Sequence, residues 1–373
     1  DYEMRSWKET IKTLDGEYEL DPKQSYFGVS ILEDHTAGVT YYKGNLSKRA
    51  VYTSENSKTI EESSGDLYGY QSAWSTTETH RINSTVIGDD WQLQYQVRPS
   101  VGVNKTLQYS KNEPTAISFF GNYREVMQNK SGLQYDIFVK PQKFFEIDDT
   151  GGVTINTYNT FEQLIAPDLE FLRGHFAEDD IKKLFSMQIL EGNTKYFQPN
   201  QAITRGEFVT ALTKAIKLPI EDVSVNKRNK KASEIAIVFP DVTKEREDYP
   251  YIMSAFKSGL AWGRTNGYFY TDYPIEREEA LVLLLRTIGL ENLGLDPTPM
   301  TSFVDDQDIS DWAKRELYAA QRIGLISGDS NGLIRPRDNI TKAEAAALIN
   351  RLVSYMREEM QTDYTENIVN YSN

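Results

Sequence analysis

Three basic residues recur in the second half of the chain at positions where their chemistry could recognise an anion. Arg205, Arg277 and Lys342 lie 72 and 65 positions apart, and each opens an apolar stretch with helical periodicity. A cation in the first turn of a helix lies beside backbone amides and the positive end of the helix dipole, which favours a bound anion. Arginine can also pair bidentately with a carboxylate, whereas lysine offers a point charge. The pattern therefore predicts anion sites at three helix starts.

The elements that would position these residues form an internal repeat. A glycine-containing segment ends at Gly192, Gly263 or Gly328, and the basic residue follows 13, 14 and 14 positions later. Each unit has the pattern of a helix, a glycine turn, a short extended piece, a loop with proline and a second helix. A unit of two helices cannot bury its own apolar face, so we expect the three units to pack into one pseudo-threefold bundle.

The second helix of each unit carries a start signal. Thr204 with Glu207, and Thr341 with Glu344, have the spacing of capping boxes, in which a hydroxyl and a carboxylate satisfy the unpaired first amides. Glu276 occupies the cap position of the middle unit, so we expect a weaker cap there. It would also repel an anionic ligand.

The first 165 residues have the texture of strands instead. Short alternating apolar stretches predict an antiparallel sandwich or barrel, with strands at residues 38–42, 91–97, 133–139 and 153–158. Glycine and aspartate clusters predict turns at residues 88–90 and 148–152. We also expect a short amphipathic helix at residues 3–14 and a loop or edge excursion at residues 54–64.

Together these patterns predict an α+β multidomain fold, with an antiparallel, sandwich-like β-rich domain followed by a mainly helical bundle. We place the β-rich domain at residues 1–165, unit 1 at 166–220, unit 2 at 221–295 and unit 3 at 296–356. A polar C-terminal tail would take residues 357–373. Unit 2 contains a long basic connection at Lys227–Lys231.

Composition excludes several classes of protein. The 373 residues carry a formal net charge of −14, which argues against a general nucleic-acid binder. The absence of cysteine excludes disulfide scaffolds and thiolate metal sites. The longest apolar run is too short to cross a bilayer. Asp1 opens a polar stretch without a signal-peptide pattern, which is compatible with a cytoplasmic chain, a processed exported chain or a trimmed one.

The repeated motifs resemble the S-layer homology (SLH) family, over roughly residues 168–356. The third unit follows the family pattern in Phe303–Asp306, Trp312-Ala313, Gly324–Gly328 and Ile340–Glu344. The second matches it in Phe239–Val242 and Ile275–Glu279, and the first in Ile203–Glu207. In the first unit Phe176 stands at the Trp312 position, and in the second Glu247 does.

The resemblance implies a bacterial cell-surface protein, held non-covalently to secondary cell-wall polysaccharide that carries a pyruvate ketal. It also implies the residues that would bind this glycan: Arg205, Arg277, Lys342, Gly192, Gly263, Gly328, Asp241, Asp305 and Trp312. Trp312 could stack on a sugar, or fill the core. For Trp262 we favour a place in the core or an interface.

Three further readings stay open at this point. Degenerate units could instead make protein–protein contacts with other copies in a surface layer or filament. An enzyme in the β-rich domain would need paired carboxylates, such as Glu146 and Asp148, and we do not expect one. No cofactor is expected, although Glu178–Asp180 and Asp305–Asp308 could hold a structural Ca²⁺. The three histidines show no metal-binding spacing.

Overall fold

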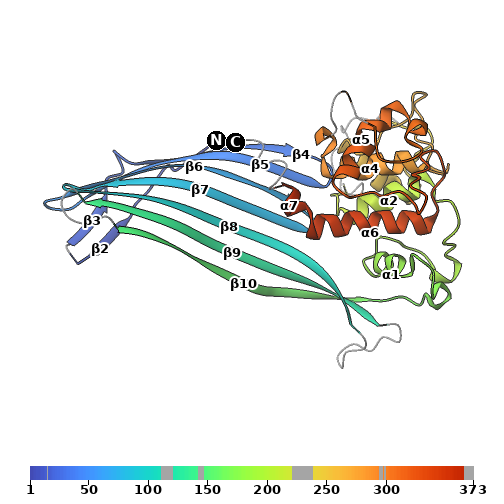
Figure 1. The fold of residues 1–373 in the computed structure, drawn as a ribbon, viewed down its shortest axis with the longest axis horizontal. Helices are drawn as coiled ribbons and strands as arrows, with labels where there is room; N and C mark the ends of the chain where they lie inside the picture. The colour runs from blue at the N-terminus through green and yellow to red at the C-terminus, as the bar shows by residue number, and fades with distance from the viewer. Residues whose placement is uncertain are drawn as a thin grey trace, which may run out of the picture.

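The computed structural model describes residues 1–14, 16–110, 121–141, 147–220, 238–293, 297 and 300–364, and the predicted basic connection at Lys227–Lys231 lies outside them. Their first half forms one long antiparallel sheet (Figure 1). The strands follow the order β1-β4-β5-β6-β7-β8-β9-β10, and β2 and β3 form a hairpin attached to β5. The strands are β1 (Tyr2–Glu3), β2 (Thr10–Thr13), β3 (Gly16–Leu20), β4 (Tyr26–His35), β5 (Val39–Thr53), β6 (Lys58–Ser72), β7 (Ser75–Ile87), β8 (Trp91–Ser110), β9 (Asn122–Pro141) and β10 (Ile147–Ile165).

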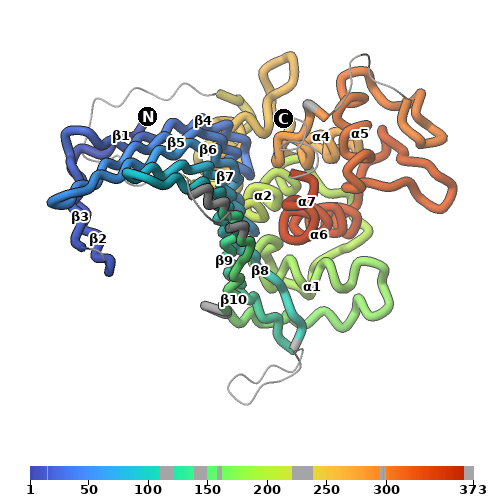
Figure 2. The backbone as a smooth tube through the Cα atoms, turned by 60° about the vertical axis from the view of Figure 1, so that its left-hand side comes forward, coloured from blue at the N-terminus to red at the C-terminus, as the bar shows by residue number. Residues whose placement is uncertain are grey.

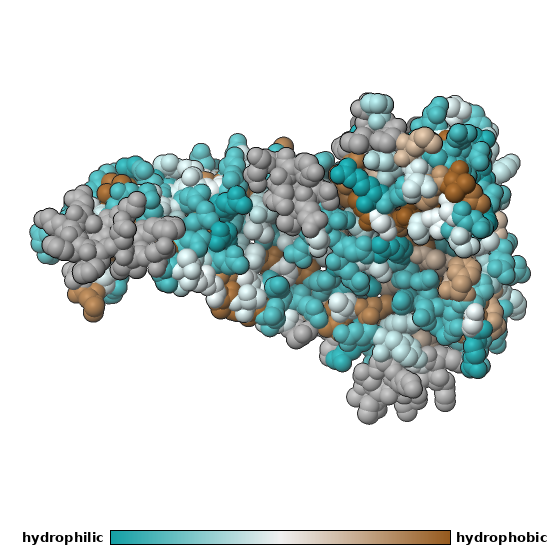
Figure 3. Space-filling view, in the orientation of Figure 1, coloured by the Kyte–Doolittle hydropathy of each residue, from teal (hydrophilic) through white to brown (hydrophobic). Residues whose placement is uncertain are grey.

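The fold class is confirmed as an antiparallel β-rich part followed by helices, but the sandwich-like arrangement is wrong. The described strands join into a single sheet and do not form two packed sheets. Ser47, Ser64, Asn83 and Gln96 are cross-strand neighbours in one polar row. Figure 3 shows mostly hydrophilic side chains on the visible face, with apolar residues in separate small patches.

Three local predictions in this half are also wrong. Residues 3–14 hold β1 and β2 in place of a helix, and most of residues 54–64 belongs to β6. The predicted turn at residues 148–152 lies inside β10, where Gly151 pairs with Tyr135 of β9. The hydroxyl end of Tyr135 covers Gly151 so closely that a Cβ atom there would lie 2.5 Å from it. Pairing along a long partner strand thus overrides the turn signal of the glycines.

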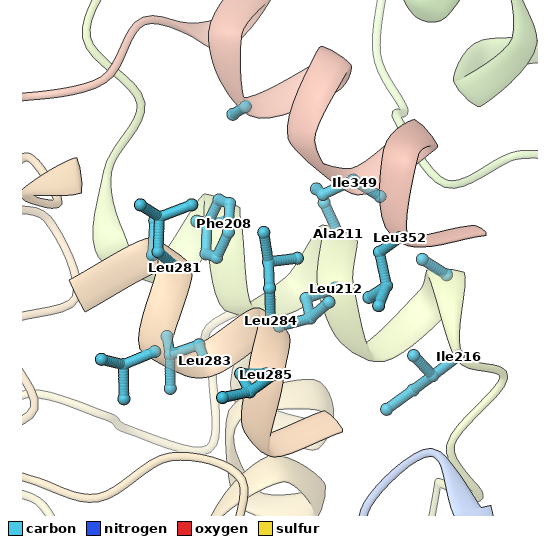
Figure 4. Packing of buried hydrophobic residues seen from close by; sticks show 14 of the residues in the cluster. Phe208, Ala211, Leu212, Ile216, Leu281, Leu283, Leu284, Leu285, Ile349 and Leu352 are labelled. Carbon is cyan, nitrogen blue, oxygen red and sulfur yellow. The ribbon is translucent and has the colours of Figure 1, made fainter. Parts of the chain in front are cut away.

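The second half has two successive helices in each unit, α1 and α2, α3 and α4, and α5 and α6, followed by a short α7. The helices that pack most closely belong to different units, α2 with α3, α4 with α5 and α1 with α6. The helices are α1 (Glu178–Ser186), α2 (Arg205–Ala215), α3 (Tyr249–Lys257), α4 (Arg277–Ile288), α5 (Asp311–Arg322), α6 (Lys342–Glu358) and α7 (Met360–Tyr364). Apolar side chains of α2, α4 and α6 meet in one core, with Phe208, Leu284 and Ile349 among them (Figure 4). The unit boundaries remain predictions.

Helix capping follows the sequence pattern. Thr204 and Thr341 form complete capping boxes with Glu207 and Glu344. Glu276, at the cap position of α4, makes no side-chain cap bond, as expected. Gly259 and Gly324 take left-handed conformations after α3 and α5, and Gln188 takes the same conformation after α1, with φ of 57°. A side chain in this conformation carries a steric cost that glycine avoids.

Backbone hydrogen bonds close the three units into a ring. The Ile203 amide donates to the carbonyl of Ile340, Ile340 donates to Ile275, and Ile275 donates back to Ile203, at 3.0 to 3.2 Å. These isoleucines are equivalent in the repeat, and all three are buried. We predicted that the three units pack around one axis because none can bury its own apolar face. These backbone hydrogen bonds hold the units in that arrangement.

The sheet and the helices share one hydrophobic core. The indole of Trp74, in the β6–β7 turn, is 1% exposed, and its Nε1 donates to the Ala215 carbonyl at 2.8 Å. Tyr364 of α7 stacks on Tyr41 of β5. Figure 1 and Figure 2 show the helical part at one end of the sheet. Met360 and Tyr364 are buried, so the predicted polar tail begins with a packed helix. No helix within the described ranges is long and apolar enough to span a membrane.

Candidate functional site

The three basic residues named from the repeat form a cyclic set of ion pairs between units. Arg205 of unit 1 meets Glu279 of unit 2 at 2.5 Å, and Arg277 of unit 2 meets Glu344 of unit 3 at 2.6 Å. Lys342 of unit 3 meets Glu207 of unit 1 at 2.8 Å, which closes the cycle. Each cation thus binds the third helical residue of the next unit.

The pKa of Glu344 shows the strength of one of these contacts. Burial by itself would raise the pKa of Glu344. The backbone amide of Thr341 and the Arg277 guanidinium outweigh burial, so the pKa lies below its ordinary value of 4.5. The carboxylate therefore stays charged, both as the partner of Arg277 and as half of a capping box.

The amides at these helix starts are occupied, which corrects the prediction of open anion sites there. The amides of Arg205 and Gly206 donate to the carbonyls of Tyr273 and Thr271. The amides of Arg277 and Lys342 likewise donate to Asp338 and Gln201. Because each helix start lies against the loop of a neighbouring unit, its dipole serves packing between units.

Arg205 is the most enclosed of the three cations, with 4% of its side chain exposed. Its guanidinium donates to Glu279 and to the carbonyls of Phe269 and Trp262, and it lies 4.0 Å from the ring centroid of Phe269. Each of the three guanidinium nitrogens thus already donates to a protein acceptor, which holds Arg205 in place between the units.

A groove of about 530 Å³ lies where all three units meet, and we call it the Trp groove. It brings together Arg205 of unit 1, Gly263 of unit 2 and Trp312 of unit 3. The indoles of Trp262 and Trp312 are 48% and 52% exposed. The expectation that Trp262 would lie in the core or an interface is therefore wrong. The full lining is Arg205, Trp262, Gly263, Arg264, Thr265, Glu276, Glu278, Glu279, Val282, Leu283, Arg286, Ser310, Trp312 and Arg337.

The charges in the Trp groove are unevenly paired. Glu278 accepts two hydrogen bonds from Ser310, at 3.0 and 2.6 Å, and Glu279 is shared by Arg205 and Arg264. Arg337 is exposed, and no ion pair to it is seen among the described residues. The groove therefore offers two aromatic faces and one uncommitted guanidinium, with Glu276 as the opposing charge.

Further arginines of the Trp groove were missed in the sequence. Arg264 directly follows the glycine turn of unit 2, and Arg337 follows the proline of the unit 3 loop. Arg286 lies in α4, with its guanidinium 5.0 Å from the ring centroid of Trp262. A search for arginines next to the glycine turns and loop prolines would have found the first two.

A second groove, of about 380 Å³, is lined by residues at the repeat positions equivalent to those of the Trp groove, each taken from the next unit. It combines Arg277 of unit 2, Gly328 of unit 3 and Phe176 of unit 1, so we call it the Phe groove. Phe176 is 71% exposed. Arg277, Arg335 and Arg351 are paired there with Glu344, Asp329 and Glu359, so its cations are more fully neutralised.

The remaining predicted residues support loops and line neither groove. Asp241 accepts the amides of Phe269, Tyr270 and Thr271, and Asp305 accepts those of Ile334 and Arg335. Burial acts to raise the pKa of Asp241, but the backbone donors hold it below 3.8. Lys342 and Gly192 also lie away from both grooves.

The glycines of the turns have packing reasons of their own. A Cβ atom at Gly263 would lie 2.6 Å from the Phe239 ring, and one at Gly328 would lie 2.9 Å from the backbone of Gly332. Gly192 has open space around it, but its φ of 109° disfavours any side chain.

The acidic clusters considered for Ca²⁺ bind protein donors. Asp306 accepts from Thr301 and Lys314, Glu178 from Gly174 and Lys182, and Asp180 from Asn350. No group of three or more acidic or histidine side chains converges within the described ranges.

This cyclic architecture agrees with a known family. The S-layer homology domain matches residues 172–209, 238–281 and 302–346. The chain carries three S-layer homology domains. Each match begins ahead of the first helix of a unit and ends within the second, so the three domains coincide with the three repeats read from the sequence.

Similarity to individual proteins covers about half of the chain. An amylopullulanase of Thermoanaerobacterium thermosulfurigenes is 30% identical over 189 residues, which are 49% of this chain and 9% of the relative. The exoglucanase XynX of Acetivibrio thermocellus is 31% identical over 189 residues, 49% of this chain and 16% of the relative. An S-layer protein of Bacillus thuringiensis subsp. finitimus is 28% identical over 176 residues, which are 47% of this chain and 20% of the relative. The chain thus spans a fifth or less of the length of these relatives.

The three S-layer homology domains and the similarity to surface-layer proteins establish a location. The chain is a protein of the cell surface or cell wall. These three matches all lie outside the β-rich part.

Proposed function

We propose that the S-layer homology domains hold the chain non-covalently to an acidic secondary cell-wall polysaccharide, and that the Trp groove is the principal binding site. The supporting observation is the pair of half-exposed indoles, Trp262 and Trp312, in one groove with the uncommitted Arg337. Indoles offer flat apolar faces to sugar rings, and a guanidinium matches a carboxylate in shape and charge.

The resemblance to the family implies a pyruvate ketal as the acidic group. A ketal carboxylate is compact and planar, so it fits a bidentate contact with Arg337. In this proposal Trp312 and Arg337 touch the glycan. Arg205, Arg277 and Lys342 act indirectly, because their ion pairs set how the units meet and so shape the grooves.

We propose that the chain is an anchoring protein and not a catalyst. Enzymatic activity in the names of the amylopullulanase and the exoglucanase belongs to those proteins. The described part of the β-rich half supports an interaction surface, since it has a concavity of about 910 Å³ lined mainly by hydroxyl and amide side chains such as Ser64, Asn83 and Gln94. Of the carboxylates considered there, Glu146 lies outside the described residues and Asp148 lies within β10.

The proposal can be tested by binding of the full chain to purified sacculi, with and without extraction of the polysaccharide. We expect binding to native sacculi and its loss after extraction. Trp312→Ala and Arg337→Gln should each weaken binding by roughly ten-fold, as expected for one stacked ring or one charge-assisted contact. Arg173→Gln is the matched control, because Arg173 is an exposed arginine with a single weak ion pair at 3.4 Å. Equal binding to extracted sacculi would refute the proposal.

An assembly role is the second candidate, supported by the use of all three repeat cations between units. In that case the grooves would take side chains of other copies. Sedimentation of the full chain over a range of concentrations distinguishes the two: concentration-dependent association that Trp312→Ala abolishes would favour assembly over glycan binding.

A further inference from the structure

Three tyrosines gather on the loop between the glycine turn and the second helix of unit 2. Tyr268 and Tyr273 are 45% and 62% exposed, and Tyr270 lies between them. The ring centroids of Tyr270 and Tyr273 are 5.2 Å apart at an interplanar angle of 78°, and those of Tyr268 and Tyr270 are 6.2 Å apart. We call these three residues the tyrosine platform.

The platform is particular to unit 2. Counted back from the basic residue, the equivalent positions in unit 1 are Tyr196, Gln198 and Gln201, and those in unit 3 are Leu333, Arg335 and Asp338. The repeat itself therefore requires no aromatic cluster at this place. Packing does not explain the outer rings either, since Tyr268 and Tyr273 leave about half of their surface in water.

The loop that carries the platform is held in one conformation. Asp241 accepts the amides of Phe269, Tyr270 and Thr271, and Asn266 donates to the Tyr270 hydroxyl. Tyr270 has a φ of 62°, a conformation that costs a side chain energy and that persists here because Asp241 fixes the backbone on both sides. A preorganised set of rings loses little entropy when a ligand covers it.

Arg264 joins the platform to the Trp groove. Its guanidinium carbon lies 5.3 Å from the ring centroid of Tyr270, and its Nη2 atom lies 3.3 Å from Glu279. Gly263, Arg264 and Thr265 also line the Trp groove. Arg264 therefore lines the Trp groove and also lies against the platform.

We propose that the tyrosine platform is a second sugar subsite, which takes uncharged sugar rings adjoining the acidic sugar in the Trp groove. This inference rests on the proposed function. Its chemistry differs from that of the groove, since phenol rings offer apolar faces and hydroxyls but no cation. In this proposal the chain recognises a stretch of several sugars, and one of these sugars carries the acidic group.

The test uses the full chain and cell-wall polysaccharide released from sacculi by peptidoglycan-digesting enzymes and separated by size. The variant is Tyr268→Ala with Tyr273→Ala, and the matched control is Tyr196→Ala, an 81% exposed tyrosine at the Tyr268 position of unit 1. We expect the double variant to bind long fragments roughly ten-fold more weakly, about 1.4 kcal/mol, because two apolar ring faces are lost. Binding of the shortest fragments and the behaviour of the control should be unchanged.

Other outcomes separate the subsite from the anchor. Equal loss for short and long fragments would mean that the tyrosines support the groove, and no loss for either would mean that they touch no sugar; both overturn the subsite and leave the anchor standing. Failure of the unaltered chain to bind any fragment would overturn the proposed function. If the double variant has the same midpoint of thermal unfolding as the unaltered chain, a folding defect is excluded as the cause of weaker binding.

Discussion

The Nζ atom of Lys342 lies 2.8 Å from Oε1 of Glu207, so the last repeat unit binds the first. This contact adds to the backbone hydrogen bonds that join the same two units, in which the Ile203 amide donates to the Ile340 carbonyl and the Lys342 amide to the Gln201 carbonyl. The Trp groove and the Phe groove are each lined by residues of all three units. Two of the three cations that join the units, Arg205 and Arg277, also line these grooves.

The three cations should differ sharply in their effect on stability. Arg205→Ala removes a buried guanidinium and leaves Glu279 without its main partner, which should cost roughly 3 kcal/mol of unfolding free energy. Lys342→Ala removes a pair whose carboxylate is 46% exposed, and should cost about 1 kcal/mol or less. Urea unfolding of both variants measures this difference. Equal losses of unfolding free energy would contradict the conclusion that the Arg205 pair is buried and the Lys342 pair is partly exposed.

Gln188 is a site where stability can be gained. Its φ of 57° is one that glycine adopts without strain, and glycine occupies the equivalent positions 259 and 324. Gln188→Gly should raise the unfolding free energy by about 1 kcal/mol. The reverse change, Gly324→Gln, should lower it by a similar amount. A thermal midpoint that falls in Gln188→Gly would show that its side chain makes an essential contact.

Asp241 should make the stability of the chain depend on pH under acidic conditions. Its pKa in the folded chain lies below the ordinary value of 3.8, so its contribution is fully present above pH 3.8 and is lost as the pH falls through the folded value. The free energy of unfolding of the full chain should therefore decrease below about pH 4. Asp241→Asn should be less stable at neutral pH and show a flatter acid limb; an unchanged acid limb would mean that other carboxylates dominate.

The junction of sheet and helices should behave as core. Trp74→Ala removes an indole that is 1% exposed and contacts α2, and it should cost about 3–5 kcal/mol. Trp91→Ala, at the β7–β8 turn and 38% exposed, is the matched control and should cost under about 1 kcal/mol. A small effect at Trp74 would mean that the two halves are stable independently.

The parts of this fold that depend on local signals could be predicted from the sequence. The capping boxes at Thr204 and Thr341, the weak cap at Glu276 and the turn at residues 88–90 involve neighbours in the chain, and the structure has them all. The predicted turn at residues 148–152 failed because its outcome depends on β9, a strand that sequence order alone does not align with it.

The repeat pointed to some residues of the Trp groove, but it gave no information about their partners. The repeat pointed to Arg205, Gly263 and Trp312, yet it gave no means of knowing that these three residues of different units share one groove. It also suggested that Arg205 would face a ligand, whereas the loop of unit 2 covers it. Contacts across units depend on how the three units close, and the spacing of motifs within a unit does not contain that information.

Calorimetric titration of the full chain with purified cell-wall polysaccharide, before and after chemical reduction of its carboxylates to alcohols, tests the anchor most directly. We predict binding to the untreated polysaccharide, a loss of roughly ten-fold or more on reduction, and no further effect of reduction in Arg337→Gln. Equal affinity for the two polysaccharides, or a reduction effect that persists in Arg337→Gln, would contradict carboxylate recognition in the Trp groove.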